Sequence, residues 1–237
     1  MGKALVLTEL RALRRAVEGG AQVERLLVRE GQPLPAPLRS LVRHYDWKVQ
    51  WVPASALPSG TYWAALLSPL RLYTLEEWLQ SPPRGIALGL LGITDPRNVG
   101  AICRSALAFG VKWIMLKAEG SPLTSNPALW RASAGALAQL YVVREKRPLQ
   151  ALQRLHAAGW EIVATTPRAE GAMPYFQWNW ATPSIILLGE EQKGIPAPYL
   201  RLASVWLTVP HHPSVESLNV SAVAAILLAE AFRQNNL

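Results

Sequence analysis

The pattern of apolar and polar positions in the first part of the chain predicts a mixture of helices and strands. A helical pattern covers residues 5–17 and stops at Gly19 and Gly20, and a second short helix is expected at residues 38–44. Strand patterns cover residues 23–28, 48–52 and 62–67, and a helix-like stretch covers residues 54–57. These elements describe a small unit that contains both helices and strands.

From residue 86 onward, short uninterrupted apolar segments alternate with helical patterns. The predicted strands are residues 86–91, 112–116, 139–143, 161–165, 184–188 and 205–209. The predicted helices are residues 99–109, 128–136, 148–158, 199–202 and 216–233. Continuous apolar strands that alternate with helices indicate an α/β fold, in which helices cover both faces of a parallel sheet.

The segment Ser81-Pro82-Pro83-Arg84-Gly85 is the best candidate for a domain boundary. Two consecutive prolines neither continue a helix nor donate to the ladder of a central strand. The hydrophobic pattern also changes at this point. We therefore expect one domain at residues 1–82 and a second at residues 86–237.

The composition indicates a globular rather than a disordered chain and a basic protein. Of 237 residues, 50% are hydrophobic and 17% are charged, which is typical of a globular chain. The net charge is +8 and the isoelectric point is near 10.0, which argues for a polyanionic partner such as RNA, DNA or a membrane surface. The net charge does not show which of these partners the protein binds. The alternative is a basic surface that binds no polyanion.

The single cysteine, Cys103, excludes an intramolecular disulfide and a metal site built from several cysteines, so we expect a reducing, cytoplasmic setting. The N-terminus lacks the apolar core of a signal peptide, and no segment reaches the roughly 18 apolar residues of a membrane span. We therefore expect a soluble protein with no membrane partner. The pair His211 and His212 has no third ligand at a suitable spacing, which predicts no metal.

Three loops that follow predicted strands carry the candidate chemistry, since open parallel sheets bind ligands at the carboxyl ends of their strands. The first loop, at residues 95–104, contains Asn98 as a helix N-cap or a loop ligand. It also contains Arg104, on a helix whose other face is apolar. The alternative is an ordinary cap and a solvated arginine.

The second loop, at residues 188–196, follows an apolar strand. Gly189 and Gly194 allow unusual backbone angles or the close approach of a ligand, and Glu191 supplies an acceptor or an ion-pair partner. The loop is not the dinucleotide fingerprint, because no G-x-G-x-x-G follows any strand. A nucleotide-dependent oxidoreductase is therefore disfavoured.

The third loop, at residues 209–221, leads into the last helix. Ser217 and Asn219 place a hydroxyl and an amide at or just inside the helix start, where free N–H groups also bind ligands. The alternative is an ordinary polar N-terminus of an apolar helix.

Over residues 86–237 the chain resembles the SpoU (TrmH) family of RNA ribose 2′-O-methyltransferases, part of the SPOUT superfamily. The resemblance rests on three motifs together: N-x5-R after the first strand, G-x-E-x-x-G after a late strand, and S-L-N-V-S opening the C-terminal helix. It implies a homodimeric catalytic domain with a C-terminal deep trefoil knot. It also implies the cofactor S-adenosylmethionine, with matching binding positions at Gly189, Val209, Leu218 and Thr165.

The resemblance implies five catalytic positions, at Arg104, Asn98, Glu191, Ser217 and Asn219. Arg104 is expected nearest to the ribose hydroxyl. It either takes the proton with the help of a substrate phosphate, or stabilises the developing alkoxide while phosphate or water takes the proton. Asn98 and Asn219 are expected to orient the nucleotide, and Glu191 to hold the arginine or its loop.

Residues 1–82 resemble the small α/β RNA-binding domain, related to a ribosomal-protein fold, that many members carry in front of the catalytic domain. Basic side chains are frequent here: Arg11, Arg14, Arg15, Arg25, Arg29, Arg39 and Arg43. Trp47, Trp51 and Trp63 could stack on unpaired bases, and core packing is the equally weighted alternative.

The chain departs from the family pattern at two places. His211 and Pro213 stand near positions where the third motif usually has Met and Gly. The segment Gly60-Thr61-Tyr62-Trp63 stands where the small domain often has His-Gln-Gly. The first departure bears on the affinity for the cofactor. The second bears on which RNA is the substrate.

The resulting prediction is an S-adenosylmethionine-dependent enzyme that methylates a ribose 2′-hydroxyl in structured RNA. The N-terminal domain favours 23S ribosomal RNA, because structured loops need an extra docking surface. Two alternatives stay open. One is methylation of tRNA, and the other is a non-catalytic RNA-binding or ribosome-assembly protein on the same fold.

Overall fold

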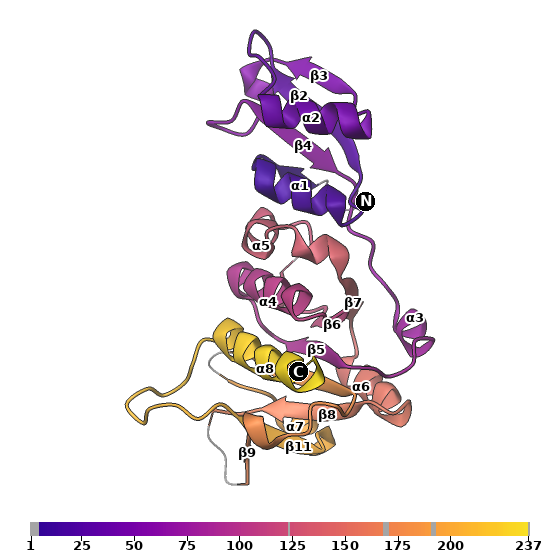
Figure 1. Cartoon of the computed structure of the whole chain (residues 1–237), viewed down its shortest axis with the longest axis vertical. Helices are drawn as coiled ribbons and strands as arrows, with labels where there is room; N and C mark the ends of the chain where they lie inside the picture. The colour runs from indigo at the N-terminus through magenta and orange to yellow at the C-terminus, as the bar shows by residue number, and fades with distance from the viewer. Residues whose placement is uncertain (1–4, 123, 168–170, 191–192, 237) are drawn as a thin grey trace.

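The computed structural model describes residues 5–122, 124–167, 171–190 and 193–236. Within them the strands form a four-stranded sheet, in the order β1-β4-β2-β3, and a seven-stranded sheet, in the order β7-β6-β5-β10-β8-β11-β9. The smaller sheet lies at one end of an elongated molecule and the larger sheet at the other (Figure 1). None of the described helices combines the length and the apolar character that a membrane span needs.

The smaller sheet and its helices come from the first part of the chain. The elements are β1 (Leu5–Leu7), α1 (Leu10–Glu18), β2 (Val23–Arg29), α2 (Ala36–Tyr45), β3 (Val49–Val52) and β4 (Trp63–Leu67). The prediction of one helix over residues 5–17 is wrong, because Leu5–Leu7 is a strand paired antiparallel to β4. Leu5 and Leu7 are both buried, a period of two that the short helical window concealed. The helix-like stretch at residues 54–57 is a 3₁₀ turn, Ala54–Ala56.

Helices α1 and α2 cover one face of the smaller sheet. Leu13 of α1 and Leu38 of α2 are fully buried in a core that also contains Leu26 of β2. Trp47 and Trp63 pack against this core, which favours the packing reading for both. Trp51 has 49% of its surface exposed, so stacking on a base stays open for this side chain alone.

The larger sheet is parallel throughout, as predicted. Its strands are β5 (Ile86–Leu91), β6 (Trp113–Lys117), β7 (Tyr141–Glu145), β8 (Glu161–Thr165), β9 (Met173–Pro174), β10 (Ser184–Gly189) and β11 (Val205–Thr208). Its helices are α3 (Leu75–Leu79), α4 (Pro96–Ala108), α5 (Pro127–Ser133), α6 (Pro148–Ala157), α7 (Ala197–Leu202) and α8 (Val220–Asn236). β10 pairs with β5 on one side and β8 on the other.

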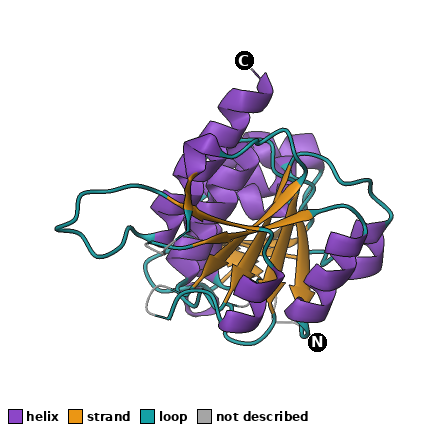
Figure 2. Cartoon of the chain, turned by 90° about the horizontal axis from the view of Figure 1, so that it is seen from below, coloured by secondary structure: helices purple, strands orange, loops and turns teal. Residues whose placement is uncertain are grey.

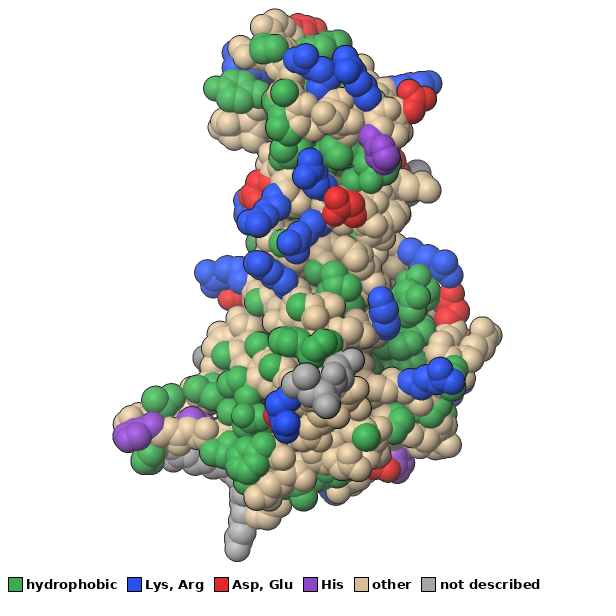
Figure 3. All heavy atoms as spheres, in the orientation of Figure 1, with side chains coloured by type: hydrophobic (Ala, Val, Ile, Leu, Met, Phe, Trp, Pro, Cys, Tyr) green, Lys and Arg blue, Asp and Glu red, His purple; other side chains and the backbone are tan. Residues whose placement is uncertain are grey.

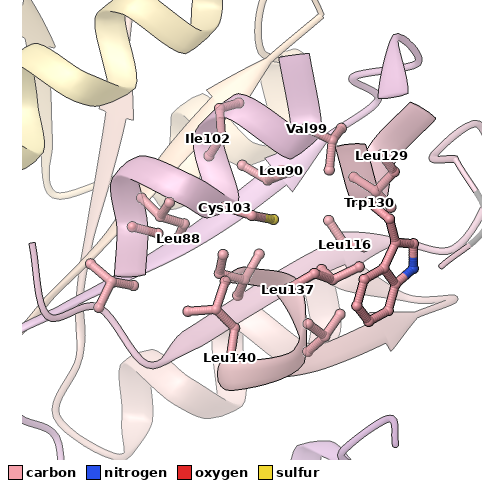
Figure 4. Close-up of a cluster of buried hydrophobic side chains, with 14 of the residues drawn as sticks. Leu88, Leu90, Val99, Ile102, Cys103, Leu116, Leu129, Trp130, Leu137 and Leu140 are labelled. Atoms are coloured by element: carbon pink, nitrogen blue, oxygen red, sulfur yellow. The ribbon is translucent and has the colours of Figure 1, made fainter. Parts of the chain in front are cut away.

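Helices cover both faces of this sheet, which confirms the predicted layers (Figure 2). On one face Leu88 and Leu90 of β5 meet α4, α5 and α8, and Figure 4 shows them beside Ile102. On the other face Ala87 and Leu91 of β5 belong to a second cluster, built with residues of α3 and α6. The alternation along β5 follows from the two-residue period of a strand, with both faces buried.

Close packing of α4 on α5 depends on Gly100. A Cβ atom at this position would lie 2.5 Å from the Cβ of Ala132 and 2.7 Å from the carbonyl oxygen of Leu129, so no larger residue fits without moving a helix. Cys103 is fully buried in the same layer, and burial raises its pKa to about 12. The thiol therefore stays protonated and serves as core packing.

Contacts made by α1 and β1 join the smaller sheet to the larger one. α1 packs against the 3₁₀ helix Ala136–Gln139, and β1 packs against α5. At Gly135, whose φ is +83°, a Cβ atom would lie 2.6 Å from the Cβ of Arg15. The α1 helix thus rests directly on the larger sheet's helical layer.

Helix α3 escaped the sequence analysis. It has five residues, too few for a visible helical period, and it is stabilised by a capping box between Thr74 and Glu77. Its Leu75 and Trp78 are buried against the larger sheet.

Candidate active site

A cavity of about 380 Å³ opens at the carboxyl ends of β8, β10 and β11. Its walls come from three stretches that follow these strands and from the start of α8. The lining residues are Thr165, Thr166, Pro167, Leu188, Gly189, Glu190, Lys193, Gly194, Ile195, Leu200, Leu207, Val209, His211, Glu216, Ser217, Leu218, Val220, Val223 and Leu227. The position agrees with the rule that ligands of parallel sheets bind beyond the carboxyl ends of strands.

Five of the nine predicted site residues line this cavity. Thr165 ends β8, Gly189 ends β10, and Val209 follows β11. Ser217 and Leu218 lie in the segment before α8. All four predicted cofactor positions are therefore on one cavity, and their role as ligands stays a prediction.

Gly189 lies where the chain folds back on the end of β10. A Cβ atom here would lie 2.4 Å from the carbonyl carbon and oxygen of Gly194 and 2.7 Å from the backbone nitrogen of Ile195. The N–H of Gly194 donates to the carbonyl oxygen of Glu190 at 2.8 Å, and Gly194 has a φ of +66°. Both motif glycines are thus needed for a tight turn that forms one cavity wall.

Thr165 ties two strands together at the edge of the cavity. Its hydroxyl donates to the carbonyl oxygen of Leu187 at 2.9 Å. The bond links β8 to β10 and leaves the Thr165 oxygen an acceptor for a ligand.

Asn98 and Asn219 are 121 positions apart and meet through their side chains. The Nδ2 of Asn219 donates to the Oδ1 of Asn98 at 3.1 Å. The Oδ1 of Asn219 accepts from the backbone N–H of Ser221 at 2.8 Å and from its hydroxyl at 2.6 Å. Because this oxygen faces two donors, the amide nitrogen must point toward Asn98. The pair joins the start of α4 to the start of α8.

Two predicted helix starts are corrected here. Asn98 is not the N-cap of its helix, because α4 begins at Pro96 and the side chain of Asp95 accepts from the backbone N–H of Arg97 at 2.8 Å. The aspartate–proline pair is a strong start signal that the apolar pattern missed. The last helix begins at Val220 rather than at residue 216, so Ser217 lies in the preceding loop.

Arg97 and Arg104 lie seven positions apart on α4, on one face of the helix. The Arg97 side chain pairs with Asp95 at 2.8 Å, and its hydrogen bonds hold the pKa of that carboxyl below the usual range. Arg104 is exposed, and within the described part of the chain its guanidinium has no hydrogen bond or ion pair. It does not line the cavity or contact the two asparagines. Glu191 lies outside the described residues.

Sequence reasoning missed three charged side chains of the cavity. Glu190 lies 3.6 Å from Lys193, and Glu216 precedes the third motif's Ser217. Their positions could have identified them, because each of these charged residues lies inside or next to one of the three motifs.

His211 also lines the cavity, and its tautomer follows from its neighbours. The Nδ1 atom lies 2.8 Å from the carbonyl oxygen of Val209, and a carbonyl only accepts, so Nδ1 carries a proton. Nε2 is then an acceptor in the neutral ring, and it is buried without a hydrogen-bond partner among the described residues. Within the same residues no group of three or more His, Cys, Asp or Glu side chains could hold a metal ion.

Comparison with known proteins identifies relatives of the chain. Residues 85–229 match the SpoU rRNA Methylase family. An uncharacterised tRNA/rRNA methyltransferase of Synechocystis is 35% identical over 68% of this chain and 58% of its own length. The 23S rRNA (guanosine-2′-O-)-methyltransferase RlmB of Pseudomonas syringae is 31% identical over 79% of this chain and 71% of that protein. The match spans about half the length of several further tRNA/rRNA methyltransferases.

Similar solved structures cover nearly the whole chain. The SpoU methyltransferase AviRb from Streptomyces viridochromogenes, in complex with AdoMet, has a TM-score of 0.82 at 23% identity, over 98% of this chain and 90% of that one. An RNA 2′-O ribose methyltransferase has a TM-score of 0.77 at 28% identity, over 99% of this chain and 90% of that one. The likeness to AviRb concerns the fold alone.

Proposed function

Since the chain belongs to the SpoU rRNA methylase family, we propose that it uses S-adenosylmethionine to methylate a ribose 2′-hydroxyl of structured RNA. The observation that carries the proposal is the gathering of the motif residues Thr165, Gly189, Val209 and Leu218 around one cavity. The similarity to RlmB favours 23S ribosomal RNA as the substrate, and the relatives named for both RNAs keep tRNA as the alternative. The proposed location is the cytoplasm, which the similarity to bacterial RlmB supports.

The cavity fits S-adenosylmethionine in size and chemistry. About 380 Å³ is within the usual range for a small-molecule site, and Leu207, Val209 and Leu218 offer apolar surface to a nucleoside. Glu190 and Glu216 supply negative charge that complements a sulfonium and an ammonium group. When bound, the cofactor supplies an electrophilic methyl group.

The backbone also shapes the cavity. Because Gly189 has no side chain, backbone atoms form this part of the wall. His211 lines the cavity at a position where the family usually has another residue, and its proposed role is to contact the bound cofactor.

The protein's own residues account for the acceptor side of the reaction. A ribose hydroxyl is a poor nucleophile until its proton leaves, so its oxygen must be held and its developing charge stabilised. Arg104 is exposed and unengaged, so it is available to a phosphate and to this oxygen. The bond between Asn98 and Asn219 fixes the two helix starts beside which the nucleotide is oriented.

An assay with isolated RNAs tests the function. Purified protein with tritiated S-adenosylmethionine is expected to label 23S ribosomal RNA, at a nucleotide whose 3′ phosphodiester then resists alkali, because a 2′-O-methyl group blocks cleavage. NAD is expected not to bind in calorimetric titration. Label in tRNA alone would select the alternative substrate, and binding of RNA without any methyl transfer would select the non-catalytic reading.

The proposal includes a homodimer. Phe176 and Phe232 are 52% and 43% exposed, and the 3₁₀ helix Tyr175–Gln177 contacts α8, so apolar surface is gathered near this helix. A second copy would bury it. Light scattering at micromolar concentration is expected to report twice the 26.1 kDa monomer mass. A mass near that of the monomer would contradict the dimer.

The proposal also includes a deep trefoil knot and an N-terminal RNA-binding domain. For the knot, the supporting observation is that β10 lies between β5 and β8, and that α8 returns to pack against α4. For the domain, it is the separate small sheet with its helix α1, on which Arg11 and Arg14 are exposed.

A further inference from the structure

The helices α1, α5 and α4 follow one another from the smaller sheet to the candidate active site (Figure 1). In the same orientation, Lys and Arg side chains gather over these three helices, with fewer acidic side chains between them (Figure 3). This arrangement rests on contacts between helices that come from distant parts of the sequence. It therefore belongs to the folded chain and is not a basic run in the sequence.

The α1 end of this surface is built by an amphipathic helix. Ala12, Leu13, Ala16 and Val17 are buried, which leaves Arg11 and Arg14 exposed on the opposite side. Neither arginine has a hydrogen bond or an ion pair among the described residues. Their charges are free to meet an anionic partner.

Arg131 extends the surface from α1 onto α5. Its side chain is 59% exposed, and its Nε lies 3.9 Å from Glu9, the residue just before α1. Such a long pair between two exposed side chains contributes little to stability, so the guanidinium remains available to a phosphate. The contact shows that Arg131 lies close to the start of α1.

Arg104 extends the surface onto α4. Gly100 faces α5, since its Cβ would meet Ala132 and Leu129. At 100° per residue, Arg104 is displaced by only about 40° from that direction and one turn further along. It therefore lies along the edge of α4 that borders α5.

We infer that Arg11, Arg14, Arg131 and Arg104 form one cationic track for the backbone of the RNA substrate. This inference rests on the proposed function. Helices α4 and α5 pack directly, which places their axes about 9 Å apart. Arg131 of α5 reaches Glu9, just before α1, at 3.9 Å. The track therefore extends over three helices, enough to contact several phosphates. The acceptor nucleotide lies at the Arg104 end, and the flanking RNA follows the track toward the smaller sheet. The exposed arginines of β2 are outside it.

A pair of matched triple variants tests the track. Arg11→Gln/Arg14→Gln/Arg131→Gln removes three charges from the track, and Arg25→Gln/Arg29→Gln/Arg43→Gln removes three exposed charges from the smaller sheet and α2. Binding of a 23S ribosomal RNA transcript is measured by fluorescence anisotropy at several salt concentrations. Glutamine keeps a polar side chain with an aliphatic stem and removes the charge, and thermal melting verifies that each variant folds.

The track variant is expected to bind the transcript at least tenfold more weakly, and its salt slope is expected to fall by about two to three, close to one for each lost phosphate contact. The control is expected to keep most of its affinity and slope. Equal losses in the two variants, or an unchanged track variant, would overturn the inference, as would track-dependent binding to phosphatidylserine vesicles without binding to RNA.

The same variants separate this inference from the proposed function. Affinity for S-adenosylmethionine and the single-turnover rate at saturating RNA are expected to be unchanged in the track variant, because Arg104 is intact. A wild-type protein that binds RNA through the track but transfers no methyl group would overturn the function and leave the track standing. If both triple variants methylated RNA with equal efficiency, the track would be overturned and the proposed function would stand.

Discussion

Replacement of Arg104 with alanine is expected to lower the rate of methyl transfer by about a hundredfold to a thousandfold. The guanidinium is exposed on α4 and makes no hydrogen bond or ion pair within the described chain, so its loss costs the fold little. In the proposed reaction, the substitution removes the donor that stabilises the charge developing on the ribose oxygen. Affinity for S-adenosylmethionine is expected to be unchanged, because Arg104 does not line the cavity.

Single-turnover methylation with tritiated S-adenosylmethionine and saturating RNA measures this effect apart from binding. Arg104→Lys should restore little, because an ammonium does not reproduce the planar two-pronged contact of a guanidinium. Arg97→Ala is the matched control on the same face of α4, since that side chain is already held by Asp95. An Arg104→Ala enzyme that kept a tenth of the wild-type rate would make Arg104 a surface residue without a catalytic role.

Replacement of Gly189 with alanine is expected to weaken binding of S-adenosylmethionine by about a hundredfold or more, the loss that follows when close-packed walls are displaced by a misfitting atom. The added Cβ would lie 2.4 Å from the backbone of Gly194. Backbone atoms cannot rotate away as a side chain does, so Gly194 and Ile195 must move away from Gly189. These residues form one wall of the cavity.

Calorimetric titration with S-adenosylmethionine measures the loss, and a thermal melt shows whether the fold survives. Gly110→Ala serves as the control for a glycine-to-alanine change away from the cavity, because a Cβ there meets nothing within 4 Å. Its φ of +77° adds a backbone cost that Gly189 does not have, so the control is the more demanding test of the fold. The control should bind the cofactor normally. Binding within tenfold of wild type in Gly189→Ala would show that the turn does not form the cofactor wall.

Much of the larger sheet could be predicted from the sequence. The strands at residues 86–91 and 161–165 were predicted with the bounds that the structure has, and β10 is one residue longer than predicted. Apolar segments without interruption signal burial on both faces, and that signal is local. Elements with weak local signals failed: β1 has three residues, and α3 has five.

Some residues of the candidate site were likewise predictable from the sequence, and others were not. The motif residues were visible in the sequence, because three motifs of fixed spacing follow predicted strands and together resemble the family pattern. The roles given to them, including that of Glu191 outside the described residues, stay predictions. His211, Glu190 and Glu216 became cavity residues only through the fold.

The sequence by itself determined the fold class, the parallel sheet with its two helical layers, and the loops that hold the motifs, because these depend on periodicity and turn chemistry within short windows. Only the tertiary structure decided that β10 lies between β5 and β8, that Asn219 donates to Asn98, and that α1 continues the arginine surface of α4 and α5. These depend on contacts between residues far apart in the chain. Strand pairing and helix packing are chosen by the fit of whole surfaces, which no local pattern contains.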